Sequence, residues 1–322
     1  MEMYVRFTNS VLDMLKPAAR VLIMIGFVAA VAAGAANAQT NAQSRKSFAS
    51  AEDAARSLVE AVKANDQASV EELFGASAMA WILSGDPVAD EQGGKRFVAA
   101  YEQKHDFERT GDDKAVLLIG NDAFPFPFPI VRVDGKWSFD PDQGKEELLR
   151  RRIGRNELNT MQVLLAIVDA QREYAAEARD SSKILAYAPR FASSQGRRNG
   201  LYWPSKEGEP QSPLGELVAR AASEGYERVP GGVRTPYHGY FFRMLVEQGK
   251  DAPGGAYSYL VNGRLIGGFA VLAYPASYAA SGVMSFLVGS DGVVYQKDLG
   301  PNTGVLARYI RAYNPDQTWK RQ

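Results

Sequence analysis

Apolar residues recur at helical spacing shortly after residue 50. Their intervals are i, i+4, i+7 and i+8, which places them on one face of a helix: Ala54, Leu58, Ala61 and Val62. Ser50 precedes this run, and serine is a favoured N-cap residue, so the sequence predicts that a helix begins directly after it. A second, shorter helix is predicted over residues 69–74.

Further along, the pattern becomes that of strands. Residues 115–119 form a short β-rich run, and residues 130–133 and 136–139 flank Asp134-Gly135, a dipeptide typical of a two-residue hairpin. Helices followed by an antiparallel sheet predict an α+β domain over residues 47–143.

Residues 124–129 alternate phenylalanine with proline. Because each proline fixes φ and removes a backbone donor, this segment is expected to be extended and to lie outside the centre of a sheet. Its three phenylalanines then share a face. That face either packs over the domain or forms an exposed docking edge.

The second half begins with helical patterns. Asp140-Pro141-Asp142 is predicted to start a helix that Gly154 interrupts, and Asn156 is predicted to cap a longer helix reaching about residue 178. The longer helix carries an apolar stripe wide enough to require burial on more than one side: Leu158, Met161, Val163, Leu165, Ile167, Val168 and Ala170.

Strand patterns dominate the remainder, after a loop-rich stretch with one short helix at residues 214–222. The predicted strands are residues 237–245, 257–261, 265–274, 284–288 and 293–296. Asn262-Gly263 and Asp291-Gly292 mark hairpin turns between them. A long helix followed by an antiparallel meander predicts a second α+β domain, over residues 144–322.

The N-terminus has the parts of an export signal. Basic residues precede an apolar run over residues 21–36, which ends in the small-residue site Ala36-Asn37-Ala38. We expect residues 1–38 to be a cleaved signal peptide and residues 39–46 a polar linker, so that the chain is periplasmic or secreted. An uncleaved anchor is the alternative, because the run approaches the ~20 residues needed to span a bilayer. No later stretch is expected to span a membrane.

Composition excludes several classes of protein. The 322 residues include 37 Lys and Arg against 37 Asp and Glu, and a net charge of zero is not that of a dedicated nucleic-acid-binding protein. The absence of cysteine excludes disulfides, thiol catalysis and Cys-ligated zinc. A chain that is 46% hydrophobic and 23% charged has the composition of a globular protein.

Common active-site motifs are absent from the sequence. It has no Gly-x-Ser-x-Gly elbow, no His-Glu-x-x-His pair and no phosphate-binding Gly-x-x-x-x-Gly-Lys loop, and we expect no cofactor.

His238 is the most distinctive candidate for a binding residue. In a strand, it would share one face with Tyr240 and Phe242, forming an aromatic and partly polar patch able to bind a sugar or a peptide. Trp203 is a fourth candidate for this ligand site. The alternative is a half-buried histidine that is hydrogen bonded within the sheet.

Six separated motifs carry a resemblance to a known family: residues 135–140, 151–158, 168–174, 200–204, 237–243 and 291–300. Over nearly the whole chain after the signal, the sequence resembles the uncharacterised exported bacterial family called domain of unknown function 2950. The family has no established activity, so the resemblance implies export and no particular reaction.

Two further resemblances concern the separate halves. The element order of the first half resembles a nuclear-transport-factor-like cone, whose open mouth binds ligands or holds an active site in relatives. The candidate residues lining such a mouth are Trp81, Tyr101, His105 and Asp106, and the alternative for His105 is an ordinary surface residue. The second half resembles the globular part of type IV pilins and pseudopilins. This resemblance implies weak candidates for a calcium site at Asp291 and Asp298, with a hairpin turn as the alternative for Asp291. A complete domain stands where pilins have a membrane-spanning segment, so filament assembly is not implied.

Two functional hypotheses follow from these observations. The first is an exported, non-enzymatic binding or assembly factor of the cell envelope, whose partner is an envelope protein or a cell-wall polymer. The second is a hydrolase or another small-ligand-binding enzyme that uses the mouth of the first domain, with His105 or a nearby carboxylate as the base.

Overall fold

Four helices open the part of the chain that we describe. The computed structural model describes residues 45–178, 183–206, 208–226 and 235–322, so the predicted signal and nearly all of the linker lie outside the described residues. The helices are α2 (Ala51–Lys63), α3 (Gln67–Phe74), α4 (Ala76–Ile82) and α5 (Pro87–Gln103). The predicted cap at Ser50 is confirmed, because its hydroxyl accepts a hydrogen bond from the Asp53 amide.

A five-stranded antiparallel sheet completes the N-terminal half. Its strands are β1 (His105–Thr110), β2 (Lys114–Ile119), β3 (Phe124–Pro125), β4 (Ile130–Val133) and β5 (Lys136–Phe139). They lie in the order β1-β2-β4-β5, and β3 pairs with β2. The predicted hairpin is confirmed, since Asp134 and Gly135 have the positive φ angles that a tight turn of this kind requires.

The phenylalanine–proline segment is divided between core and surface. Phe128 is buried against Phe74, and Phe126 packs at its side, so both belong to the core of the N-terminal half. Phe124 is 53% exposed and lies beneath the Arg151 guanidinium. The expected common face therefore contributes two of its three rings to the core.

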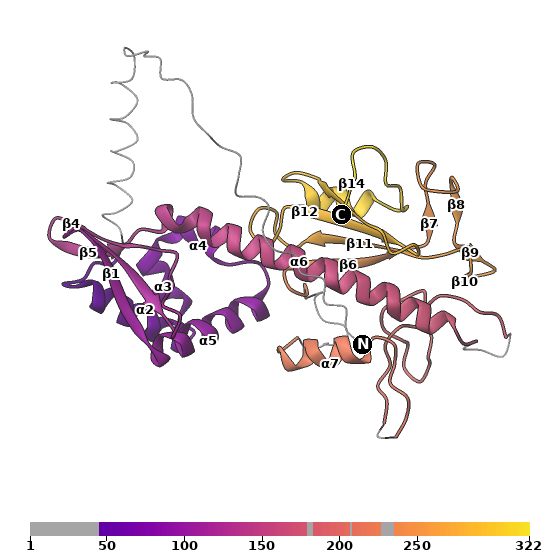
Figure 1. The fold of residues 1–322 in the computed structure, drawn as a ribbon, viewed down its shortest axis with the longest axis horizontal. Helices are drawn as coiled ribbons and strands as arrows, with labels where there is room; N and C mark the ends of the chain where they lie inside the picture. The colour runs from indigo at the N-terminus through magenta and orange to yellow at the C-terminus, as the bar shows by residue number, and fades with distance from the viewer. Residues whose placement is uncertain (1–44, 179–182, 207, 227–234) are drawn as a thin grey trace, which may run out of the picture. The chain divides into compact units, whose positions relative to one another are not determined.

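The long helix α6 (Pro141–Ala175) joins the two halves, and it is continuous. It runs from the N-terminal helices and strands across the C-terminal sheet (Figure 1). The predicted interruption at Gly154 is wrong. A helical glycine costs only about 1 kcal/mol relative to alanine, and packing of the residues on both sides outweighs this cost. Asn156 lies inside the helix, where its side-chain amide donates to the Ser281 carbonyl oxygen.

The C-terminal half is built on a second antiparallel sheet, in the order β14-β13-β12-β11-β6. These strands are β6 (Tyr240–Leu245), β11 (Ala270–Pro275), β12 (Met284–Gly289), β13 (Val294–Asp298) and β14 (Lys320–Arg321). Two small ribbons pair β7 (Glu247–Gln248) with β8 (Tyr257–Ser258), and β9 (Leu260–Val261) with β10 (Arg264–Leu265). Two short helices accompany the sheet, α7 (Gly215–Ser223) and α8 (Thr303–Tyr309).

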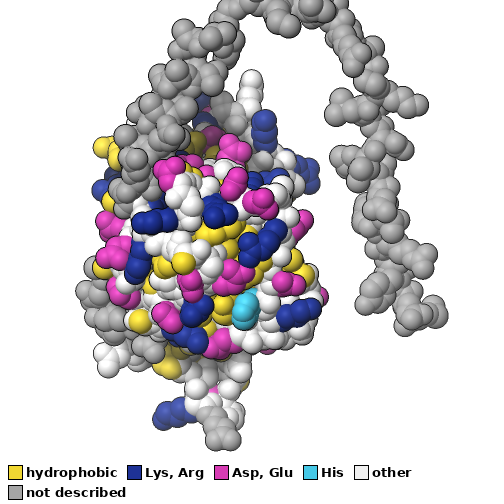
Figure 2. Space-filling model, turned by 90° about the vertical axis from the view of Figure 1, so that its left-hand side faces the viewer, with side chains coloured by type: hydrophobic (Ala, Val, Ile, Leu, Met, Phe, Trp, Pro, Cys, Tyr) yellow, Lys and Arg dark blue, Asp and Glu magenta, His cyan; other side chains and the backbone are white. Residues whose placement is uncertain are grey.

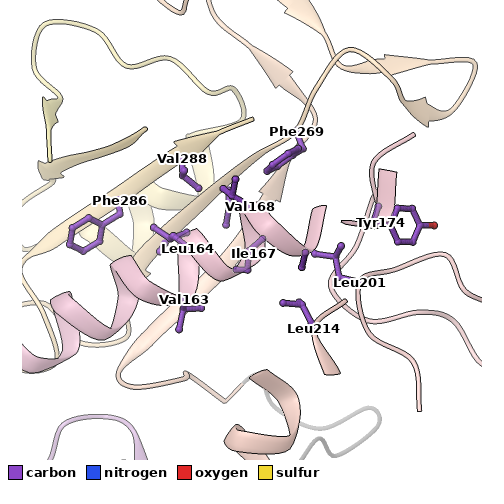
Figure 3. Close-up of a cluster of buried hydrophobic side chains, with 14 of the residues drawn as sticks. Val163, Leu164, Ile167, Val168, Tyr174, Leu201, Leu214, Phe269, Phe286 and Val288 are labelled. Atoms are coloured by element: carbon purple, nitrogen blue, oxygen red, sulfur yellow. The ribbon is translucent and has the colours of Figure 1, made fainter. Parts of the chain in front are cut away.

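Helix α6 packs its apolar face against one side of this sheet. Figure 3 shows Leu164 and Val168 of α6 pointing toward Phe286 and Val288 of β12. The opposite side of the sheet carries a separate cluster that includes Leu272 and Ala307 of α8. Strand β11 is therefore buried on both faces. The stripe on α6 is buried on one side, since Leu158 and Leu165 remain exposed.

The described chain thus confirms the α+β class, with helices and antiparallel sheets in both halves. The predicted boundary between residues 143 and 144 falls in the first turn of α6. The division into two independently folding domains stays a prediction. In the part of the chain that the structure covers, no helix has the length and apolar character needed to cross a membrane.

Candidate functional site

A buried carboxylate lies where the two halves meet. Asp86 caps α5, and its Oδ1 accepts from the Ala89 amide at 3.1 Å. Its Oδ2 accepts from the Gly239 amide at 2.8 Å and from the Tyr226 hydroxyl at 2.9 Å. The Asp86 side chain is fully buried. One acid of the N-terminal half therefore satisfies two donors of the C-terminal half.

The partner of Asp86 is a tight turn rather than a strand. Tyr237 and Tyr240 exchange two backbone hydrogen bonds, and the residues between them, His238 and Gly239, both have positive φ. This is the geometry of a two-residue hairpin turn, so the prediction of a continuous strand over residues 237–245 is wrong at its start. A Cβ at Gly239 would lie 2.7 Å from the Asn156 Nδ2, which leaves room for glycine alone.

The His238 ring lies at the partly exposed edge of this junction. Its Nε2 is 3.1 Å from a carboxylate oxygen of Glu224, and the side chains of His238 and Glu224 are 25% and 34% exposed. The rings of Tyr237 and Tyr226 lie beside it, with centroids 4.2 and 5.7 Å away. We call these four side chains, together with Asp86, the His238 site: Asp86, Glu224, Tyr226, Tyr237 and His238.

Three side chains of the His238 site have shifted pKa values: Tyr226, Tyr237 and His238. Burial lowers the pKa of His238, and it outweighs the opposing attraction of Glu224. Burial also raises the pKa of Tyr237 to about 12, with the Glu224 charge acting in the same direction. The pKa of Tyr226 is raised by burial and by the Asp86 charge. Both phenols therefore stay protonated near neutral pH.

Arg152 forms a second tie between the halves. Its guanidinium donates to the carbonyl oxygens of Trp81, Ile82 and Ala280. Burial lowers the pKa of Arg152, partly opposed by the charge of Asp90. Asp90 accepts from the Ser84 amide, and burial raises its pKa. These groups have acceptors and donors within the protein, so their role is to hold α4, α5 and α6 together.

The other residues proposed for the His238 patch lie in the core. Tyr240 is 0% exposed and its hydroxyl donates to the Met284 carbonyl oxygen. Trp203 belongs to the same core cluster, and Phe242 packs against it half-buried. Because the turn redirects His238, these four side chains do not share one exposed face.

The residues proposed for a pocket in the N-terminal half have separate surroundings. His105 is exposed on the edge strand β1, where its ring stacks on Tyr101 with centroids 3.9 Å apart. Asp106 accepts from the adjacent Phe107 amide. Trp81 instead packs near Phe128. Figure 2 shows acidic and basic side chains interspersed over this end of the molecule, with no extensive patch of one sign.

The candidate calcium ligands stabilise turns. Asp291 Oδ1 accepts from the Val293 amide, and Asp298 accepts from the Gly300 amide and the Tyr278 hydroxyl. Among the residues described, no group of three or more His, Asp or Glu side chains is placed to hold a metal ion.

Sequence patterns did not identify Asp86, Glu224 or Tyr226 as parts of a site. Asp86 lies 153 residues before Gly239, and no local pattern reports a contact over that distance. Two local patterns could have helped to find the site. Asp86-Pro87 is typical of a helix start, and His238-Gly239 is a dipeptide that suits a tight turn.

With asparagine in place of His238, the stability of the protein is expected to fall less steeply as the pH is lowered. Because the pKa of His238 is lowered in the folded state, the unfolded chain binds more protons below about pH 6.5. The contribution of neutral His238 to stability is therefore present above that pH and is lost as the pH falls through the folded-state pKa. Asparagine tolerates the positive φ of the turn and carries no proton.

The measurement is the melting temperature between pH 5 and 7, and the exposed His105→Asn variant is the control. The charged and titratable groups around the ring are common to both chains: Asp86, Arg96, Arg155, Glu224, Tyr226 and Tyr237. If the melting temperature fell equally steeply with pH in His238→Asn and in the unsubstituted chain, the lowered pKa of His238 would be contradicted.

Comparison with known proteins gives one match. The family described as protein of unknown function DUF2950 matches residues 45–322, which includes every described helix and strand. No curated protein and no solved structure matches the chain significantly. The likeness of the two halves to a nuclear-transport-factor-like cone and to pilins therefore stays a prediction. Since the family match covers most of the sequence, the chain belongs to the DUF2950 family.

Proposed function

We propose that this chain is exported and acts in the cell envelope as a binding protein, without catalysing a reaction. Its ligand is recognised at the His238 site. The observation that carries this proposal is the partly exposed pair of His238 and Glu224, set against a rigid, fully hydrogen-bonded Asp86. A recognition surface requires such fixed donors and acceptors on a support that does not move.

The protonation states favour recognition over catalysis. Tyr226 and Tyr237 have raised pKa values, so their hydroxyls serve as hydrogen-bond donors and not as nucleophiles. The Tyr226 hydroxyl already donates to Asp86 and accepts from the His238 amide. His238 therefore has no activated nucleophile beside it among the residues the structure describes. In the N-terminal half, His105 is exposed and stacked on Tyr101, which gives the hydrolase hypothesis no further support.

The predicted export signal supports the envelope as the site of action. Cleavage after Ala38 would release a chain whose described residues contain no candidate membrane span. The predicted likeness of both halves to modules used for binding and assembly agrees with a binding role.

Site-specific photo-crosslinking in living cells tests the proposal. A photoreactive amino acid replaces Arg220, which is exposed on α7 and whose charge acts on Tyr237. The matched control carries the same amino acid at His105, which is exposed in the other half. We expect a discrete adduct of higher mass in the envelope fraction from position 220 and none from position 105.

Two results would contradict the proposal. One is retention of the chain in the cytoplasm with its N-terminus intact and no adduct at position 220. The other is hydrolysis of cell-wall fragments by the purified chain, if the His238→Asn variant no longer hydrolyses them. The second result would show that the His238 site is an active site and not only a binding site.

A further inference from the structure

Two arginines beside the His238 site differ from Arg152 and Arg109 in the partners of their guanidinium groups. Arg152 donates to three carbonyl oxygens, and Arg109 pairs with Glu52. In contrast, the guanidinium groups of Arg96 and Arg155 have no hydrogen-bond or ion-pair partner among the described residues. We call these two side chains the arginine pair.

Helix geometry places Arg155 at the junction. It follows Arg152 by three residues on α6, so the two lie on neighbouring turns of one helix face. It also precedes Asn156, whose side chain contacts the backbone at Gly239 and donates to Ser281. Arg155 therefore leaves α6 next to the turn that carries His238.

Arg96 approaches the same place from α5. Val88 and Gln92 lie one turn apart on this helix, and both side chains come within 4 Å of the Cβ position of Gly225, between Glu224 and Tyr226. Arg96 is one turn beyond Gln92 on that face. A guanidinium nitrogen of Arg96 lies 4.0 Å from the Cβ position of Gly93, so the side chain folds back along α5 toward the His238 site.

Electrostatics agrees with this geometry. Both side chains are exposed at the surface. Partial burial of its guanidinium nevertheless lowers the pKa of Arg155, and the positive charge of Arg96 lowers it further. The charges of Arg155 and Arg96 also lower the pKa of His238. The two like charges repel each other, and their exposed donors are open to a bound anion, which would reduce this repulsion.

The acids nearby are already engaged. Asp86 accepts from Gly239 and Tyr226, Asp90 accepts from Ser84, and Glu224 faces His238. Asp86 and Asp90 are fixed by these bonds, whereas the Glu224 oxygen that faces His238 is buried and has no hydrogen-bond partner in the described protein. None of the three acids forms an ion pair with the arginine pair in the described part of the chain. Their three negative charges nevertheless reduce the positive potential at the junction, so a ligand group with one negative charge fits better than a multiply charged phosphate.

We propose that Arg96 and Arg155 bind the carboxylate of the ligand recognised at the His238 site. This inference rests on the proposed function and names the chemical group that the site takes. A planar guanidinium donates two parallel hydrogen bonds to a carboxylate, and the adjacent Tyr237 and His238 rings offer an apolar surface to the group that bears it. The carboxylate belongs either to a small organic acid or to the C-terminus of a peptide.

Isothermal titration of the purified chain with four probes tests this assignment. The probes are acetate, N-acetyl-alanyl-alanine, the C-terminal amide of that dipeptide, and inorganic phosphate. We expect the dipeptide acid to bind and its amide not to bind. Acetate binding as tightly as the dipeptide acid would identify a small organic acid, and much weaker acetate binding would identify a peptide terminus.

Glutamine substitutions locate the carboxylate. Arg96→Gln and Arg155→Gln are each expected to weaken binding of the dipeptide acid by about tenfold or more, because each removes a charge-assisted hydrogen bond. Arg150→Gln is the matched control, since Arg150 is exposed on the same helix and pairs with Glu147. It is expected to bind as the unsubstituted chain does.

A ligand-free measurement separates binding from damage to the fold. Arg155→Gln removes an unpaired charge, so its melting temperature without ligand is expected to equal or exceed that of the unsubstituted chain. Equal binding of acid and amide, tighter binding of phosphate, equal losses in Arg150→Gln, or no binding of any probe would each overturn the inference. Adducts from position 220 in cells would still support the proposed function in those cases.

Discussion

Substitution of Asp86 by alanine is expected to lower the free energy of unfolding by about 3 kcal/mol. The change removes the cap of α5, which is worth about 1 kcal/mol. It also leaves the Gly239 amide without its acceptor inside the protein, and a buried donor without a partner costs about 1–3 kcal/mol. The Tyr226 hydroxyl loses its acceptor as well. Because these donors lie in the C-terminal half, the junction is expected to loosen as a whole.

Urea denaturation of two matched variants checks this result. Asp66→Ala is the control, because Asp66 also caps a helix, α3, but is exposed and bonds only within its own turn. Its loss is expected to be about 1 kcal/mol. Asp86→Asn keeps one acceptor oxygen and should fall between the two. Similar losses for Asp86→Ala and Asp66→Ala would show that the bonds to Gly239 and Tyr226 add nothing to stability.

Local chemistry in the sequence predicted much of the fold. Ser50 and Asp140 cap helices because their side-chain oxygens satisfy free amides at a helix start, and this requirement is local. Asp134-Gly135 and Asn262-Gly263 take the positive φ angles of tight turns for an equally local reason. These four signals place the starts of α2 and α6 and two of the hairpins.

Predictions failed where packing outweighs local preference. Helix α5 has no buried residue and contains Gly93-Gly94, so no apolar period marks it. Gly154 weakens a helix by an amount that the buried residues further along α6 recover. The His238-Gly239 turn was hidden within an apolar and aromatic run that has strand character.

The candidate site was predictable only in part. His238 was identified from its own residue type, and the structure places it at the junction of the two halves. Its neighbours Asp86, Glu224 and Tyr226 come from two other segments. Their approach depends on how the segment that follows α7 lies against α5. The arginine pair has the same origin, since Arg96 and Arg155 lie on different helices. The sequence around each arginine does not indicate that the other arginine lies nearby in the folded protein.

Two glycines of α6 are expected to respond to alanine in opposite directions. At Gly144 an added Cβ would overlap the Pro127 carbonyl oxygen and the Phe128 ring, and the proline backbone has little freedom to move. We expect Gly144→Ala to lower the free energy of unfolding by about 2 kcal/mol, within the range for overpacked cores, despite the better helix propensity of alanine.

Gly154→Ala makes the same chemical change at an open position of the same helix. No atom lies within 4 Å of the added Cβ and φ is not positive, so alanine should stabilise the protein by up to about 1 kcal/mol. Urea denaturation of both variants measures the difference. A loss of stability in Gly154→Ala would mean that α6 bends or ends there, whereas a gain requires the helix to continue through Gly154. Since α6 carries Arg152, Arg155 and Asn156 just around this glycine, the sign also tests whether the junction is built on an unbroken helix.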